Sequence, residues 1–171
     1  MKPSEVCPSE FHPYFKPYMD KVSDIPLLEA LELGAKETLS FFESIPQSKM
    51  NYRYSEKKWT IKDILLHIVD AERAFCYRAL NFARSKNSNL EGFDENVYVV
   101  SAQANSRSIT GLLEEYQAVR QASIVLFSSF SDEDLKRVGK ANNAKLSVRA
   151  AGFLICGHEI HHIQVIKDRY L

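Results

Sequence analysis

The sequence predicts an all-α protein, a four-helix bundle preceded by a proline- and aromatic-rich N-terminal arm and containing one long crossover loop. Four segments of about 20 residues repeat their apolar side chains at helical spacing, and no segment shows a convincing β-strand alternation. Helices of that length are about 30 Å long, which suits a four-helix bundle. We expect an arm over residues 1–25 and a single helical domain over residues 26–171.

The arm is expected to be extended, because prolines recur in it at a density that excludes a regular helix, at Pro3, Pro8, Pro13 and Pro17. Its aromatic rings are expected to pin it to the body of the protein. Pro26 suits the first turn of the first helix, whose apolar stripe runs from Leu28 to Phe42 and which ends by Pro46.

The second helix is predicted to begin after Thr60, a plausible N-cap with Asp63 three residues on, and to reach about Ala83. Residues 85–105 contain Gly92 and several asparagines without a long period, which indicates a crossover loop with room for one short helix. The long connection argues that not every successive pair of helices is a tight antiparallel hairpin.

A third apolar stripe runs from Ile109 to Phe130. Residues 139–144 are expected to turn the chain, and Ser147 can cap the last helix, whose stripe continues to Ile166. These segments complete the four helices of the predicted bundle.

The charge balance and the cysteines exclude several classes of protein. Lys plus Arg and Asp plus Glu both total 22, so no net charge attracts nucleic acid or anionic lipid. The three cysteines are odd in number and share no C-x-x-C spacing, which favours free thiols in a reducing compartment. The sequence shows neither a signal peptide nor an apolar run long enough for a membrane span, so we expect a cytoplasmic protein without nucleic-acid or membrane partners.

The C-terminal segment matches the H-E-x-x-H pattern of zinc metalloproteases at residues 158–162. His158 and His162 are one helical turn apart, so both imidazoles can reach one metal ion. A zincin takes its third ligand from further along the chain, but residues 163–171 contain no His or Glu, and Asp168 is too near His162 for the chain to fold back. A metal site therefore requires a ligand from upstream.

The best upstream candidate is His67, beside the apolar stripe of the second helix, where Ala71 and Ala74 would leave open space next to its imidazole. We predict that the side chains of three histidines converge from two helices on one divalent ion, at His67, His158 and His162. Three neutral imidazoles with open positions are typical of a catalytic site. Nitrogen ligands suit zinc or nickel first, with iron, cobalt and manganese as further candidates.

The alternative is that these histidines are ordinary residues of the core boundary. A single histidine on a half-apolar helix face is usually not a ligand, and H-x-x-x-H pairs also arise by chance. His12 is a poor candidate in either case, because the proline-rich arm offers no rigid platform.

Two segments resemble the DinB superfamily, the DinB/YfiT-like metalloenzymes: Trp-Thr-Ile-Lys-Asp-Ile-Leu-Leu-His-Ile at residues 59–68, and Gly-His-Glu-Ile-His-His at residues 157–162. The resemblance covers most of the chain from about residue 26. It implies a four-helix bundle with a metal triad at His67, His158 and His162, and His161 as a neighbour that does not bind the ion. It also implies a homodimer, for which the aromatic arm at residues 11–18 is our candidate contact.

Other polar residues near the predicted triad have both functional and structural interpretations. Glu159 occupies the position of a zincin's general base, but a role on the surface or in hydrogen bonding to a ligand imidazole is favoured. Asp70 is a comparable candidate for supporting an imidazole. Arg78 could hold an anionic group of a substrate or thiol cofactor, or form an interhelical ion pair, which is favoured. Glu72 and Arg73 are expected to form interhelical salt bridges.

Two classes of function remain open at this point. A three-histidine metal site can activate water or a thiol, which predicts a hydrolase or an S-transferase that uses a low-molecular-weight thiol. The family resemblance implies the second reaction, because characterised members of that family include thiol S-transferases and a mycothiol-dependent maleylpyruvate isomerase. The alternative is a helical bundle that binds a metal or a small ligand without turnover.

Overall fold

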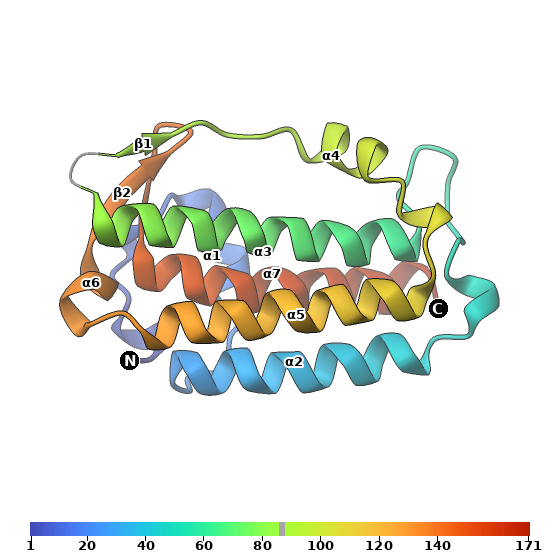
Figure 1. Cartoon of the computed structure of the whole chain (residues 1–171), viewed down its shortest axis with the longest axis horizontal. Helices are drawn as coiled ribbons and strands as arrows, with labels where there is room; N and C mark the ends of the chain where they lie inside the picture. The colour runs from blue at the N-terminus through green and yellow to red at the C-terminus, as the bar shows by residue number, and fades with distance from the viewer. Residues whose placement is uncertain (86–87) are drawn as a thin grey trace.

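The computed structural model describes residues 1–85 and 88–171, and it confirms the four-helix bundle (Figure 1). The long helices are α2 (Leu27–Ser44), α3 (Ile61–Arg84), α5 (Ile109–Ser128) and α7 (Val148–Arg169). They pack in a ring in the order α2, α5, α3 and α7, with α7 closing against α2.

The direction of the helices explains the long crossover. In Figure 1, α3 and α5 run the same way, and α2 and α7 run the opposite way. The chain must therefore return along the length of the bundle between α3 and α5. This return contains β1 (Asn89–Leu90), the predicted short helix as α4 (Glu95–Ala102), and the 3-10 turn η5 (Ala104–Ser106). Residues 86–87 of the predicted loop lie outside the described residues.

Local sequence sets the helix ends, as expected. The Thr60 hydroxyl accepts a hydrogen bond from the Asp63 amide at 3.1 Å, and the Asp63 carboxylate accepts one from the Thr60 amide at 2.9 Å. Ser147 caps α7 by accepting from the Ala150 amide at 3.1 Å. Pro26 is the N-cap of α2 and does not lie in its first turn, a shift of one residue from the prediction.

The expectation that the chain has no strand is wrong at one end of the bundle. After α6 (Asp132–Lys136), strands β2 (Val138–Ala141) and β3 (Ala144–Ser147) form an antiparallel hairpin, and β1 pairs parallel to β2. The two-residue loop of the hairpin holds Asn142 and Asn143 at φ values of 51° and 59°, a conformation that asparagine tolerates. Strands of four residues are too short to show a clear alternation in sequence.

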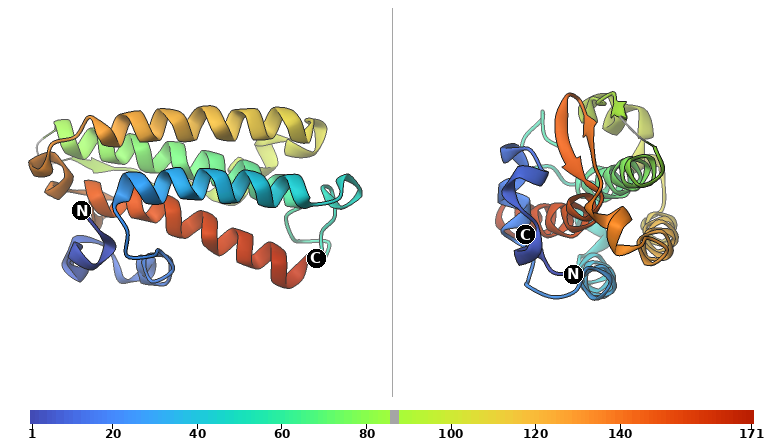
Figure 2. Two further views of the ribbon diagram at one scale, coloured as in Figure 1. Left: turned by 90° about the horizontal axis from the view of Figure 1, so that it is seen from below. Right: turned by 90° about the vertical axis from the view of Figure 1, so that its left-hand side faces the viewer.

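The N-terminal arm is not simply extended. It forms three 3-10 turns and one helical turn, η1 (Pro3–Glu5), η2 (Pro8–Glu10), η3 (Pro13–Phe15) and α1 (Lys16–Met19); a further turn, η4 (Gln47–Lys49), follows α2. Pro3, Pro8 and Pro13 each begin a 3-10 turn and Pro17 is the second residue of α1, positions where a missing N–H costs little. The arm folds against its own chain (Figure 2): Phe11 is buried, and the Glu10 carboxylate accepts from Arg149 Nε at 2.7 Å.

The dimer contact predicted at residues 11–18 stays a prediction, and most of its rings pack within the chain. Of these aromatic residues, Tyr14 alone belongs to the exposed large hydrophobic side chains of the described chain.

The interior contains two apolar clusters, one around Leu31, Phe82 and Phe153 and the other around Phe42, Leu65 and Ile166. Buried polar residues separate them at mid-height of the bundle. Within the described part of the chain, no helix is both long and apolar enough to cross a membrane.

Candidate metal centre

Helices α3 and α7 bring the three predicted histidines together. The Nε2 atom of His158 lies 3.1 Å from that of His67 and 3.1 Å from that of His162. One ligand nitrogen from each residue lies within 4.8 Å of the other two. His161, by contrast, turns its ring against Tyr18, with 5.1 Å between ring centroids. The residues 158 and 162 share one face of α7 because they are one turn apart.

These side chains fit a divalent ion. Around a tetrahedral ion with metal–nitrogen bonds of 2.0–2.1 Å, neighbouring nitrogens are about 3.3 Å apart, close to the separations found here. His67 is buried, and His158 and His162 are half-buried. The cluster therefore lies near the protein surface and is accessible from one side.

Burial and the neighbouring imidazoles keep the rings of His67, His158 and His162 neutral, which is the form that can bind a metal ion. Burial lowers the pKa of His67 to about 4, and burial together with His67 and His161 lowers the pKa of His162 to about 3. Burial and the adjacent imidazoles of His162 and His67 also lower the pKa of His158 well below its usual value. All three rings are therefore neutral at pH 7 and offer nitrogen lone pairs.

The triad lines a cavity of about 570 Å³ between α3 and α7. The predicted open space is there, since Ala71 and Ala74 both line the cavity. The N-terminal arm, the segment around Phe93 and the β2–β3 hairpin form the other walls. Helices α3 and α7 thus provide the floor of the cavity, and the irregular parts of the chain enclose it.

The aromatic walls of this cavity were not predicted. The ring centroid of Trp59 lies 4.7 Å from that of His67, Tyr18 lies 5.6 Å from His158, and Phe75 lies 6.4 Å from His158. Trp59 stands next to the Thr60 cap, so its position could have been inferred from the start of the helix. Tyr18 gave no such signal, because its position depends on how the arm packs.

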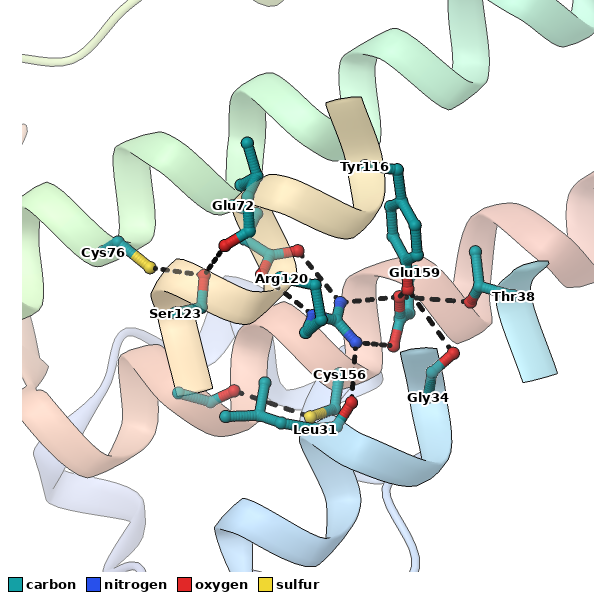
Figure 3. A network of polar contacts seen from close by, with 12 residues as sticks. Leu31, Gly34, Thr38, Glu72, Cys76, Tyr116, Arg120, Ser123, Cys156 and Glu159 are labelled. Carbon is teal, nitrogen blue, oxygen red and sulfur yellow. Dashed lines mark hydrogen bonds and ion pairs between the residues drawn. The ribbon is translucent and has the colours of Figure 1, made fainter. Parts of the chain in front are cut away.

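Glu159 points into the interior of the bundle, where Figure 3 shows it beside Arg120, Tyr116 and Thr38. Its carboxylate accepts hydrogen bonds from Arg120 Nη2 at 2.7 Å, from the Tyr116 hydroxyl at 2.9 Å and from the Thr38 hydroxyl at 3.2 Å. The side chain is only 1% exposed, so the expected surface role is wrong. Nor is Glu159 among the residues that line the cavity, and this position does not suit a general base.

Arg120 is the centre of this buried network and was missed in the sequence. Its guanidinium also donates to Glu72, with Nε and Nη2 each 2.9 Å from a carboxylate oxygen, and Nη1 donates to the Leu31 carbonyl at 3.0 Å. The predicted interhelical pairing of Glu72 is thus confirmed, and Arg73 likewise pairs with Glu115 on α5 at 2.7 Å. The sequence did contain a signal for this network, because Arg120 is a charged residue inside the apolar stripe of the third helix.

The network contains two carboxylates, those of Glu72 and Glu159, and one guanidinium, that of Arg120. Despite burial, the carboxylates of Glu159 and Glu72 raise the pKa of Arg120 well above its usual value, so it stays charged. Burial raises the pKa of Glu159, which Arg120 opposes, and burial with the Glu159 charge raises that of Tyr116. All four helices contribute to the network, which therefore holds them in one register.

Asp70 and Arg78, two further residues singled out in the sequence, do not have the surroundings that we expected. The Asp70 carboxylate accepts from Arg73 at 3.2 Å, and no hydrogen bond joins it to an imidazole among the described residues, so its predicted supporting role is wrong. Arg78 lines the cavity and contacts the rings of Phe75 and Phe93. The favoured ion pair of Arg78 is also wrong, since no described carboxylate lies within ion-pair distance of it.

The cysteines are free thiols in the structure, as expected. Cys156 is buried and turned away from the triad, with its sulfur 3.7 Å from the Gly152 carbonyl oxygen. Burial raises its pKa above the usual value, and burial likewise raises that of Cys76 to about 11. Neither thiol has the lowered pKa of a reactive cysteine.

Comparisons with known proteins agree with this arrangement. The DinB superfamily matches residues 30–166, and no curated protein matches the chain. YfiT from Bacillus subtilis, described as a probable metal-dependent hydrolase with an unusual four-helix bundle topology, is 18% identical, with a TM-score of 0.75 over 83% of this chain and 82% of its own.

Two more solved structures share the fold. The DinB-like protein YjoA from Bacillus subtilis is 18% identical, with a TM-score of 0.60 over 83% of this chain and 87% of its own. A mycothiol-dependent maleylpyruvate isomerase is 14% identical, with a TM-score of 0.64 over 86% of this chain and 62% of its own.

Proposed function

This chain belongs to the DinB superfamily, and we propose that it is a divalent-metal-dependent enzyme that holds its ion with His67, His158 and His162. The observation that supports this most directly is the convergence of three ligand nitrogens within 4.8 Å of one another at the wall of a cavity. Zinc or nickel is the proposed ion, because neutral imidazoles suit both.

The residues of the cavity suit activation of a small nucleophile. A bound ion would supply Lewis acidity, which lowers the pKa of a coordinated water or thiol toward neutrality. The three neutral imidazoles leave the ion its full positive charge, since none is an anionic ligand. The rings of Trp59, Tyr18 and Phe75 lie beside the triad, and an apolar lining of this kind strengthens electrostatic interactions there.

We propose hydrolysis or the transfer of a low-molecular-weight thiol as the reaction. Both need an activated nucleophile; of the proteins that share the fold, YfiT is described as a probable metal-dependent hydrolase and the maleylpyruvate isomerase as mycothiol-dependent. The substrate is a small molecule, because the cavity has about 570 Å³. We also propose that the protein acts in the cytoplasm as a homodimer; a monomer by light scattering at micromolar concentration would contradict the latter.

Metal analysis of the purified, untagged protein tests the site. We expect one divalent ion per chain, lost in His67→Ala and in His158→Ala. His161→Ala is the matched control, because it removes an imidazole from the same helix outside the triad, and it should keep its metal. An ion-free protein after reconstitution with zinc and nickel would contradict the proposal.

Activity assays then separate the two reactions. The metal-loaded protein is incubated with a generic ester, or with an electrophile plus bacillithiol or glutathione. Metal-dependent product in the first assay supports hydrolysis, and conjugate in the second supports thiol transfer. A protein that binds metal but gives a flat time course in every assay would favour the alternative, a bundle that binds metal without turnover.

A further inference from the structure

The cavity has a positive end as well as a metal-binding end. Arg78 lies on α3, three turns beyond His67, and its guanidinium carbon is 5.5 Å from the Phe75 ring centroid and 5.8 Å from that of Phe93. It is half-buried, and in the described chain no carboxylate lies within ion-pair distance of it. Burial lowers the pKa of Arg78, which an anion beside the guanidinium would oppose.

The two ends of the cavity are close enough for one small molecule to reach both. The Phe75 centroid is 5.5 Å from the Arg78 guanidinium carbon and 6.4 Å from the His158 centroid. The guanidinium and that imidazole therefore cannot be further apart than these distances laid end to end, about 12 Å. Helical side chains tilt toward the N-terminus, which brings the arginine back toward the histidines.

The wall between the two ends is apolar. Phe15, Ala71, Ala74 and Phe75 line it. Glu95 also lines the cavity and would repel a second negative charge. The surroundings thus favour a ligand with an apolar middle and one anionic group, and the planar guanidinium matches a carboxylate by two parallel hydrogen bonds.

We propose that the substrate is an elongated monocarboxylic acid, bound with its carboxylate on Arg78 and its reacting group at the three histidines. This inference rests on the proposed function, whose substrate class it names. Arg78 is a binding residue in it, and selects the substrate by charge.

Trp59 provides a direct measure of binding. It is the single tryptophan of the chain and lies at the cavity, 4.7 Å from His67 between ring centroids, so its fluorescence should report an occupied cavity. The probes are mercaptooctanoate and mercaptooctanol, which share a thiol and a chain and differ in the carboxylate. Each is titrated into zinc-loaded and into metal-free protein.

In the wild type we expect the carboxylate to tighten binding about ten-fold over the alcohol, as a charge-assisted hydrogen bond should. The preference should disappear in Arg78→Gln and persist in part in Arg78→Lys, which keeps a point charge. Arg73→Gln is the control, because it removes the same charge from α3 on its exposed side. Circular dichroism checks that each variant folds.

Equal affinity for the two probes, or a carboxylate preference that survives in Arg78→Gln, would overturn the inference. The experiment contains two comparisons, which test the role of Arg78 and the proposed metal site separately. The comparison of carboxylate with alcohol, made with and without zinc, tests Arg78. The comparison of zinc-loaded with metal-free protein tests the metal site, and a thiol affinity that zinc does not change would count against the proposed function.

Discussion

At the scale of single residues, the neighbours His158 and Glu159 have opposite surroundings. Successive residues of a helix are about 100° apart, so one side chain reaches the cavity and the next enters the bundle interior. There the Glu159 carboxylate meets Arg120, Tyr116 and Thr38. The histidine is thus fixed by its neighbour: any rotation of α7 that displaced His158 would also break the buried ion pair.

Removal of the central arginine should therefore be severe. In Arg120→Met both Glu72 and Glu159 would stay buried without their partner, and we expect the free energy of unfolding to fall by about 3–5 kcal/mol. The measurement is urea denaturation. Arg73→Met, which breaks half-exposed ion pairs on the same bundle, should cost less than about 1 kcal/mol. Similar losses in both variants would contradict this account of the network.

The buried imidazoles make the stability of the metal-free protein depend on pH. The pKa of His67 falls from 6.5 to about 4 on folding, so between these values the unfolded chain binds more protons. The stabilisation is complete above pH 6.5 and is lost as the pH falls to 4, by on the order of 3 kcal/mol for this group. When the midpoint of thermal unfolding is measured across this range, it should fall less steeply with falling pH in His67→Ala than in wild type.

At the scale of elements, the N-terminal arm supplies one wall of the cavity whose floor is formed by α3 and α7. Its contact with α7 depends on Gly157, the residue before His158. A Cβ atom there would lie 2.1 Å from the Tyr18 carbonyl oxygen, which is backbone and cannot rotate away. The glycine therefore lets the arm approach α7 closely enough for Tyr18 to line the site.

Gly157→Ala should displace the arm while the bundle stays folded. We expect faster proteolysis within residues 1–25 and a helical circular dichroism spectrum close to wild type. Gly152→Ala is the matched control on the same helix, because its Cβ would meet the ends of the Leu27 and Phe127 side chains, which can move. An arm as protease-resistant in Gly157→Ala as in wild type would show that the close contact does not hold it.

At the scale of the whole molecule, metal binding should stabilise the fold itself. The proposed ligands come from α3 and α7, which separate when the chain unfolds, so an ion that binds only the folded form raises its stability by mass action. With free zinc at a thousand times its dissociation constant, we expect about 4 kcal/mol. Thermal unfolding of zinc-loaded and metal-free protein measures this. The increment should vanish in His158→Ala and remain in His161→Ala; a midpoint that zinc leaves unchanged in wild type would contradict binding by the native fold.

Periodicity and capping were sufficient to predict the four helices, and the one-turn spacing of His158 and His162 was sufficient to place both on one face of the last helix. These features are local, because a helix places residues one turn apart on the same face wherever it stands. The short strands, the turns of the arm and the partners of Glu159 could not be inferred, since each depends on contacts between segments far apart in the chain.

The sequence by itself therefore determined the helical class of this protein and offered His67, His158 and His162 as candidate metal ligands. Only the tertiary structure decided that Arg120 joins four helices through buried charge, that the arm encloses the cavity, and that Arg78 faces into it without a carboxylate partner in the described chain. The physical reason is that a side chain's periodicity depends on its own helix, whereas its burial, its partners and its pKa depend on which other segments pack against that helix.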